Sequence, residues 1–109
     1  MERLETEERF AALREAETLL VVQFGAVTCA PCTAIHQKLE AWLEGHPGAA
    51  GVYIPVEDFR ALAAQEGVFT VPTVFVYVEG RLTVRASGYF SLEEVLAQAE
   101  RYERLLGST

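Results

Sequence analysis

Two cysteines separated by two residues are the part of this sequence best suited to redox chemistry. Cys29 and Cys32 flank Ala30 and Pro31, and the chain has no other cysteine. In the first turn of a helix this spacing brings the two sulfurs within bonding distance, so that the pair can alternate between dithiol and disulfide. The N-terminal end of a helix stabilises a thiolate, which makes Cys29 the expected nucleophile.

The residues within and after the pair have supporting roles in this interpretation. Pro31 in the first helical turn loses no helical hydrogen bond and fixes φ, which restrains the loop in a geometry that both redox states share. Cys32 is expected to be shielded and to resolve the mixed disulfide. His36 lies one turn beyond Cys32 on the same helical face, where it is either an ordinary, partly exposed histidine or a group that handles the proton of the resolving thiol.

A metal site is another interpretation of the cysteine pair. Cys29, Cys32, His36 and His46 are four nominal ligands of the kind that bind zinc. If residues 32–44 are helical, however, the rise of about 1.5 Å per residue places His46 far from the cysteines. The spacing therefore favours redox chemistry over a bound metal.

The elements on either side of the pair also point to redox chemistry. Residues 19–24 form a nearly unbroken apolar run, which predicts a strand buried on both faces. Within residues 32–44, Ile35, Leu39 and Trp42 recur at helical spacing, and a glycine follows. A buried strand before the motif and a helix after it form the context in which this cysteine spacing indicates thiol–disulfide exchange.

The rest of the sequence predicts further strands and helices in alternation. Asp58 is expected to cap a helix, and Ser91 and Glu94 are expected to form a capping box at the start of another. The expected elements are helices at residues 5–15, 58–66 and 91–106, a strand at residues 51–56, and a hairpin of strands at residues 74–78 and 82–86. This order predicts an α/β fold with a mixed sheet.

Length, charge and hydropathy restrict the class of protein. The chain has 109 residues, half of them hydrophobic, so residues 1–109 are expected to form a single domain that acts as a monomer. Sixteen acidic and nine basic side chains give a net charge of -7, which argues against nucleic acid and anionic membrane as partners. The first eighteen residues are charged and the sequence has no apolar run long enough to span a bilayer, so we expect a cytoplasmic protein.

The sequence resembles the thioredoxin family from about residue 4 to residue 106. This resemblance implies the thioredoxin fold, an α/β architecture with a central mixed β-sheet of four to five strands flanked by helices on both faces, and it implies no cofactor. It rests on motifs in several separate places. These are Cys29-Ala30-Pro31-Cys32, Thr70-Val71-Pro72-Thr73, and glycines at Gly67, Gly80 and Gly88.

The resemblance also assigns a substrate groove. It implies that Pro72 is a cis-proline packed beside the cysteines, and that the main chain of Val71 pairs with an extended substrate segment in the manner of an added strand. Phe69 either lines the groove or is a packed loop aromatic. The further residues assigned to the groove are Ala30, Thr70 and Gly88.

Three positions depart from the family pattern at the chemical centre. The family's buried aspartate is replaced by Gln23, whose amide can form hydrogen bonds but cannot accept a proton in the useful range. The family's tryptophan before the first cysteine is Thr28, and its lysine on the following strand is Tyr53. These changes predict slower exchange through Cys32 and a different set of clients.

The function implied is reduction of protein disulfides by a thiol–disulfide oxidoreductase. The expected partners are disulfide-containing client proteins and a thioredoxin-reductase-type flavoenzyme that restores the dithiol. The alternative is an interaction or holdase module that keeps the fold after its redox activity has weakened, because the aspartate, tryptophan and lysine of the family are absent.

Overall fold

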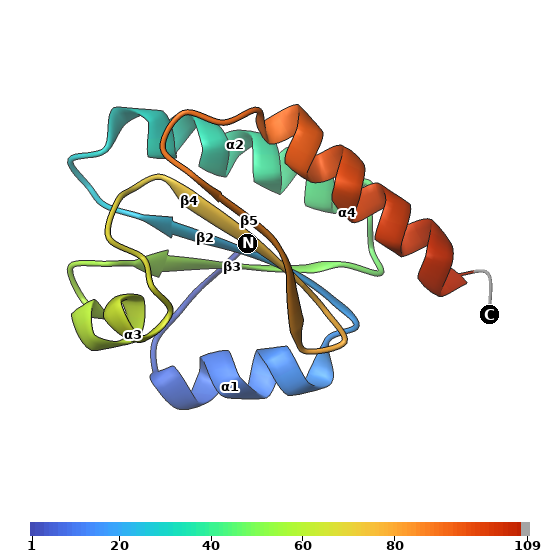
Figure 1. The fold of residues 1–109 in the computed structure, drawn as a ribbon, viewed down its shortest axis with the longest axis horizontal. Coiled ribbons are helices and arrows are strands. Elements are labelled where there is room, and N and C mark those ends of the chain that lie inside the picture. The colour runs from blue at the N-terminus through green and yellow to red at the C-terminus, as the bar shows by residue number, and fades with distance from the viewer. Residues whose placement is uncertain (108–109) are drawn as a thin grey trace.

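A five-stranded mixed sheet forms the middle layer of the computed structural model, which describes residues 1–107 (Figure 1). The strands are β1 (Glu2–Arg3), β2 (Leu19–Gly25), β3 (Ala50–Pro55), β4 (Thr73–Val78) and β5 (Arg81–Ser87), in the spatial order β1-β3-β2-β4-β5. The first three strands in that order are parallel, whereas β4 and β5 are antiparallel to their neighbours. The predicted mixed sheet with helices is confirmed.

Helices cover both faces of the sheet. They are α1 (Glu7–Ala16), α2 (Ala30–Glu44), α3 (Arg60–Gln65) and α4 (Leu92–Gly107). Figure 1 shows α2 and α4 on one face and α1 and α3 on the other. The core is accordingly split in two: Phe10 and Leu62 pack on the α1/α3 side, and Leu39 and Val95 pack on the α2/α4 side.

The central strand β2 is buried along its whole length, as its apolar run predicts. Alternate residues supply the two cores, with Leu20 and Val22 on the α1/α3 side and Leu19 and Val21 on the α2/α4 side. A strand buried on both faces is held firmly in register, because a slip of one residue would exchange its two faces. The loop that follows β2 therefore starts from a rigid support.

The hairpin of β4 and β5 turns through two residues, Glu79 and Gly80. Both have positive φ, 51° and 81°, which is the conformation of the tight turn that matches the twist of paired strands. Glycine adopts this conformation without steric cost, whereas Glu79 does so less readily. The predicted hairpin is confirmed, with longer strands than expected.

Three details differ from the sequence-based expectations. The short strand β1 was not predicted, because two charged residues carry no strand pattern. The α3 helix is shorter than expected, and Asp58 does not cap it; the capping position is Phe59, without a side-chain hydrogen bond, and Asp58 pairs instead with Arg3 at 3.4 Å. At the start of α4, the amide of Glu94 donates to Ser91 Oγ over 3.2 Å, which is one half of the expected capping box.

Four strands deliver loops to the same edge of the sheet. Phe24 of β2 pairs with Thr73 of β4, and Thr73 pairs with Ser87 of β5. Gly25 at the end of β2 pairs with Pro55 at the end of β3. The segments after β2, before β4, after β5 and after β3 therefore meet at one place.

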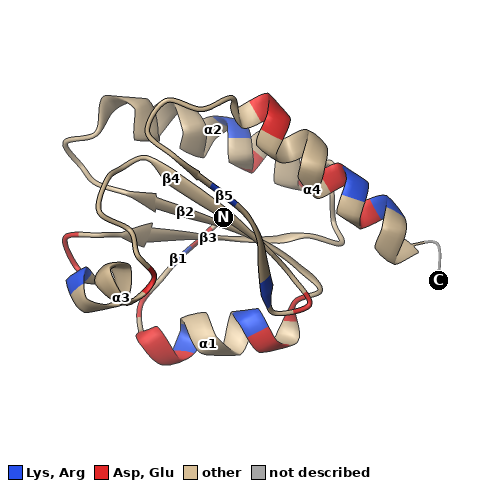
Figure 2. Cartoon of the chain, in the orientation of Figure 1, with Lys and Arg blue, Asp and Glu red and all other residues tan. Residues whose placement is uncertain are grey.

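The charged residues are unevenly distributed around this edge. Figure 2 shows acidic and basic residues along α1, along α4 and around α3, whereas the first half of α2 carries none. Within residues 1–107, no helix combines the length and the hydropathy that crossing a membrane would require.

Candidate active site

The two cysteines lie at the N-terminus of α2 and are joined in a disulfide. Cys29 occupies the capping position before the helix, Cys32 lies in its first turn, and their Cα atoms are 5.3 Å apart. The amide of Cys32 donates to the carbonyl oxygen of Cys29 over 3.2 Å, which closes the turn. Pro31 falls at the first helical positions, where its missing N–H removes no helical bond.

The two sulfur-bearing residues differ in exposure. Cys29 is partly exposed, whereas Cys32 is only 3% exposed. The first turn of α2 contains no acidic residue that would oppose a thiolate at the helix N-terminus. This arrangement is suited to attack on an external disulfide by Cys29, which is accessible, and to intramolecular disulfide exchange by Cys32, which is buried.

Gln23 lies beneath the pair on β2 and is fully buried. Its Nε2 donates a hydrogen bond of 2.9 Å to the main-chain oxygen of Cys32, which ties the strand to the first turn of the helix. Its Oε1 is buried and has no hydrogen-bond partner among the described residues. The position that would hold a carboxylate in the family pattern therefore holds a neutral group that positions the helix.

The loop before β4 lies at the same edge of the sheet, because Thr73 at the start of β4 pairs with Phe24 near the end of β2. The peptide bond between Val71 and Pro72 is cis, and the amide of Gly88 donates to the oxygen of Pro72 over 3.0 Å. Thr73 Oγ1 lies 2.7 Å from the oxygen of Thr70 and so fixes the same loop. These bonds hold Val71 and Gly88 beside one another at the edge of the sheet.

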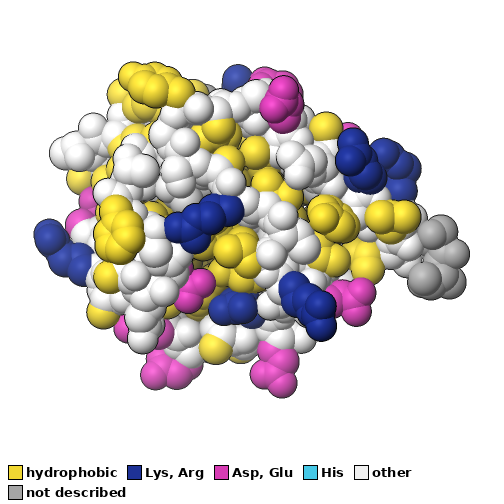
Figure 3. All heavy atoms as spheres, in the orientation of Figure 1, with side chains coloured by type: hydrophobic (Ala, Val, Ile, Leu, Met, Phe, Trp, Pro, Cys, Tyr) yellow, Lys and Arg dark blue, Asp and Glu magenta, His cyan; other side chains and the backbone are white. Residues whose placement is uncertain are grey.

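A rim of exposed hydrophobic side chains surrounds this edge. Val27, Phe69 and Tyr89 are 85%, 84% and 107% exposed, and they come from the loops after β2, before β4 and after β5. Figure 3 shows hydrophobic side chains at the surface over the loop between β5 and α4 and beside α3. The alternative in which Phe69 is a packed loop aromatic is therefore wrong.

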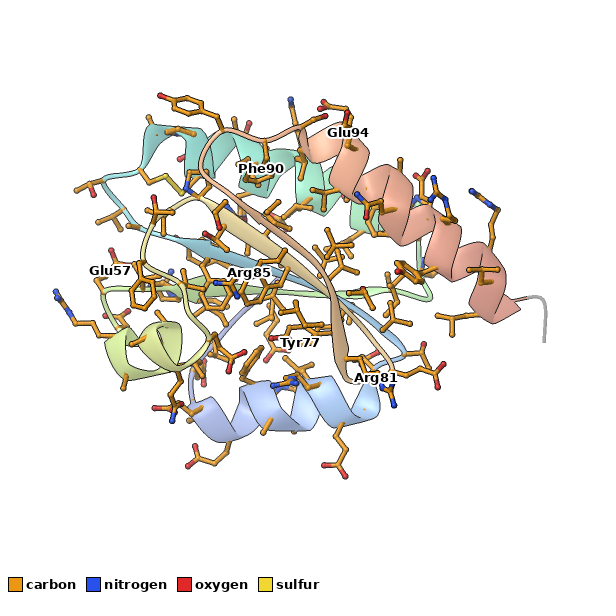
Figure 4. All side chains as sticks on the ribbon, in the orientation of Figure 1. Glu57, Tyr77, Arg81, Arg85, Phe90 and Glu94 are labelled. Atoms are coloured by element: carbon orange, nitrogen blue, oxygen red, sulfur yellow. A yellow bond between two sulfur atoms is a disulfide. The ribbon has the colours of Figure 1, made fainter. Side chains whose placement is uncertain are left out.

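A cavity of about 440 Å³ opens beside this rim. Thr28, Phe69, Thr70, Val71 and Glu57 contribute to its lining. Figure 4 shows Glu57 near the end of β3, next to α3. The carboxylate of Glu57 accepts a 3.2 Å hydrogen bond from the amide of Val27, so this residue fixes the loop that leads to Cys29.

A second cavity, of about 700 Å³, lies on the other side of the cysteine turn. It brings together Cys32, His36 and Glu40 of α2 with Tyr53 of β3 and Arg3 of β1. His36 Nε2 lies 2.8 Å from Glu40 Oε1, and the His36 ring meets the Tyr53 ring edge-on at 5.5 Å between centroids. His36 thus borders the same cavity as Cys32.

The charges around this cavity shift two pKa values in opposite directions. Burial, together with the nearby carboxylate of Glu57, raises the pKa of Tyr53 above its usual value of 10. The amino group of Met1 and, to a smaller extent, His36 lower the pKa of Glu40. At neutral pH Tyr53 is therefore a neutral phenol and Glu40 a carboxylate.

The opposite end of α2 holds the other histidine. His46 stacks on Trp42 at 3.9 Å between ring centroids and lies 2.7 Å from Glu103 and 3.4 Å from Glu100. It therefore does not approach the cysteines. Within residues 1–107, no group of three or more His, Cys, Asp or Glu side chains is arranged to hold a metal ion.

Sequence reasoning missed several residues at this edge. Tyr89 and Val27 are single apolar residues in loops, and neither periodicity nor spacing distinguishes an exposed loop aromatic from a packed one. Glu57 was not singled out, because its contact with Val27 spans thirty residues. The pairing of His36 with Glu40 could have been found, since the two stand four residues apart on a predicted helix.

Comparisons with known proteins agree on one family. The thioredoxin family model matches residues 2–101. Thioredoxin-1 of Schizosaccharomyces pombe is 34% identical over 64 residues, which cover 59% of this chain and 62% of that protein. Thioredoxin-2 of Saccharomyces cerevisiae is 31% identical over 78 residues, which cover 72% of this chain and 75% of that protein.

A solved structure shows the same fold. The thioredoxin of Plasmodium falciparum superposes with a TM-score of 0.84 at 20% sequence identity, and the match covers 94% of this chain and 99% of that one.

Proposed function

Because the chain belongs to the thioredoxin family of thiol–disulfide oxidoreductases, we propose that it reduces disulfides of client proteins through Cys29 and Cys32. The observation that carries this proposal is the disulfide at the N-terminus of α2, with Cys29 partly exposed and Cys32 buried. The two steps of exchange need one cysteine that a client disulfide can reach and one that reacts inside the protein, and the different exposure of Cys29 and Cys32 meets this need.

The proposed reaction begins with the reduced protein. The Cys29 thiolate attacks one sulfur of the client disulfide, the client's S–S bond breaks, and the electron pair leaves on the other client sulfur. A mixed disulfide now joins Cys29 to the client. Cys32, as a thiolate, attacks Cys29 Sγ and releases the second client thiolate, which leaves the Cys29–Cys32 disulfide seen here.

Client docking is assigned to the edge where the loops meet. The main chain of Val71 is proposed to pair with an extended client segment, and Ala30, Thr70 and Gly88 to form the floor of the groove. The exposed rings of Phe69 and Tyr89 support this assignment, because covering such side chains with apolar client surface is favourable. Thr28 leaves room beside them for a bulky client side chain, in the cavity of about 440 Å³.

The proposal also covers the electron donor, the cellular location and the oligomeric state. A thioredoxin-reductase-type flavoenzyme would return two electrons to the Cys29–Cys32 disulfide after each cycle. A cytoplasmic location and a monomeric state complete the proposal, since a reducing compartment keeps such a dithiol available.

The test is reduction of insulin by the purified protein with dithiothreitol, followed by the turbidity of the released chains. We expect the parent protein to shorten the lag before turbidity, and we expect the Cys29→Ser variant to behave as dithiothreitol alone does. A parent protein no faster than its Cys29→Ser variant would contradict the proposal.

A holdase function is a second candidate, and the exposed Val27, Phe69 and Tyr89 are the observation that favours it. The two functions differ in their need for sulfur. A variant with both Cys29→Ser and Cys32→Ser should lose insulin reduction. It would still suppress the aggregation of client proteins only if the apolar rim binds them without help from the cysteines.

A further inference from the structure

The second step of the proposed reaction needs a proton acceptor that Gln23 cannot supply. Cys32 must lose its thiol proton before it attacks, yet it is 3% exposed, and burial disfavours a free thiolate. Gln23, fully buried on the strand beneath it, carries a neutral amide whose nitrogen is already bonded to the Cys32 oxygen at 2.9 Å. The inference that follows rests on the proposed function and concerns this proton.

The cavity of about 700 Å³ is where a proton can leave Cys32. Cys32 is part of its lining, and so is His36, one helical turn further along α2. The two residues are four apart in α2, so they lie on the same face of the helix, and both border this cavity. The volume is ample for water molecules that would bridge the two residues.

Three ionisable side chains that face this cavity besides His36 are poor acceptors at neutral pH, and the amino terminus of Met1, which also borders it, pairs with Glu40 over 2.9 Å. Tyr53 on β3 is held in its neutral form, because burial raises its pKa. Glu40 is a weak base, because the amino group of Met1 lowers its pKa. Arg3 on β1 is already protonated, and it lies over the Tyr53 ring at 5.7 Å. Imidazole is the group that ordinarily changes charge between pH 5 and 8.

The contacts of His36 orient the ring for this task. Its Nε2 lies 2.8 Å from Glu40 Oε1, and a hydrogen bond to a carboxylate requires the proton on Nε2. In the neutral ring Nδ1 is then the acceptor. The edge-on contact with Tyr53 limits the rotation of the ring from the side of β3.

We propose that His36 is the general base for Cys32, receiving the thiol proton through water in this cavity. The Cys32 S–H bond breaks, the proton is transferred by water to Nδ1 of His36, and the electron pair stays on sulfur. That thiolate attacks Cys29 Sγ, and the electron pair of the broken mixed disulfide leaves on the client sulfur. The imidazolium then returns its proton to the client thiolate or to solvent, which balances the step. Glu40 is a positioning residue for His36.

The experiment isolates the second step by stopped-flow reaction of the reduced protein with dithiobis(nitrobenzoate). This disulfide releases one coloured thiolate when Cys29 attacks and a second when Cys32 resolves. The leaving thiolate has a low pKa and needs no protonation, so the second phase reports deprotonation of Cys32. We expect His36→Ala to slow the second phase about a hundredfold at pH 7 and to leave the first phase unchanged.

Further measurements distinguish proton transfer from packing. The pH profile of the second phase should differ between the parent and His36→Ala, because only the parent carries an imidazole in this cavity. Added imidazole should restore the second phase of His36→Ala in proportion to its concentration. In the Gln23→Asp background, where a carboxylate stands beside Cys32, His36→Ala should have little further effect.

The control is His46→Ala, which removes the other histidine at the far end of the helix and should leave both phases as in the parent. His36→Gln serves as a second variant, because it keeps the size and polarity of the side chain without a titratable group. A second phase within twofold of the parent in both His36 variants would overturn the proposal, and so would equal slowing of both phases. Absence of either phase in the parent would instead contradict the proposed function.

Discussion

The side-chain amide of Gln23 donates a hydrogen bond of 2.9 Å to the main-chain oxygen of Cys32 in the interior of the protein. This contact joins the central strand β2 to the first turn of α2, so the sheet positions the reactive turn directly. The same side chain leaves its Oε1 without a partner among the described residues. Gln23 therefore stabilises the position of the site and contributes no proton acceptor.

The first prediction concerns the stability that Gln23 provides. Gln23→Leu should lower the free energy of unfolding by about 1 kcal/mol, because the lost hydrogen bond to the Cys32 oxygen is partly offset by removal of the unpartnered Oε1. Gln23→Asp should lower it by a few kcal/mol as well, since a carboxylate is then buried near the cysteines. Urea unfolding of the oxidised proteins at pH 7 measures both. A Gln23→Leu variant as stable as the parent would show that the bond contributes nothing.

The second prediction concerns thiol reactivity. In the reduced protein near pH 7, iodoacetamide should modify Cys29 and leave Cys32 unmodified, because the helix N-terminus favours the Cys29 thiolate and burial disfavours that of Cys32. Mass spectrometry of peptides after limited modification identifies the site. Faster modification of Cys32 would reverse the roles assigned to the two residues.

The third prediction concerns the apolar rim. Phe69→Ser and Tyr89→Ser should each raise the KM for a protein disulfide about tenfold, because the client then covers less apolar surface. Neither should change the rate with a small disulfide that does not reach the rim. Steady-state reduction of insulin and of hydroxyethyl disulfide provides the comparison.

Two other exposed hydrophobic residues serve as matched controls for the rim. Leu82 and Leu105 are 41% and 60% exposed, and they belong to β5 and to the end of α4, outside the loops at the active edge. Leu82→Ser and Leu105→Ser should leave KM for insulin unchanged. If they raise it as much as Phe69→Ser does, client binding does not depend on the rim.

The fourth prediction concerns stability in alkali. Tyr77 is buried against α1, its hydroxyl donates to Glu66 over 2.9 Å, and burial strongly raises its pKa (Figure 4). Above about pH 10 the unfolded chain loses this proton while the folded chain keeps it, so the free energy of unfolding should fall as the pH rises. Tyr77→Phe should cost about 1 kcal/mol at pH 8, from the lost hydrogen bond.

The same substitution should reduce the fall in stability between pH 9 and pH 11, and urea unfolding of the oxidised protein at both values measures it. Tyr102→Phe is the control, since Tyr102 is only partly buried in α4. Equal loss of stability in the parent and in Tyr77→Phe over this range would show that Tyr77 is not the group responsible.

Periodicity and composition were sufficient to predict much of this fold. The apolar run of β2 and the helical spacing of Ile35 and Leu39 identified the strand and the helix around the cysteines, and both are present. The strand β1 escaped prediction, because Glu2 and Arg3 form a strand only by pairing with β3, a contact across fifty residues. The family resemblance is confirmed by the family model.

The site was predictable to the extent that its residues are close in sequence. The spacing of Cys29 and Cys32 identifies them in the sequence. That Tyr89 lies at the same edge of the sheet depends instead on strand pairing, of Phe24 with Thr73 and of Thr73 with Ser87. Strand register is a property of the folded sheet, so the sequence alone does not show that loops far apart along the chain lie next to one another. The cap assigned to Asp58 is wrong because α3 begins at Arg60, which puts Phe59 in the capping position, and the Asp58 carboxylate pairs with Arg3.

The most direct test of the account is the capture of client proteins by single-cysteine variants. In the Cys32→Ser variant, Cys29 can still attack, but nothing resolves the mixed disulfide, so covalent complexes should accumulate. The measurement is the amount of a disulfide-containing client, such as insulin, held covalently by Cys32→Ser and by Cys29→Ser, and released by dithiothreitol. We expect abundant dithiothreitol-sensitive complexes with Cys32→Ser and almost none with Cys29→Ser. Equal amounts with the two variants would contradict the assignment of Cys29 as the nucleophile and Cys32 as the resolving thiol.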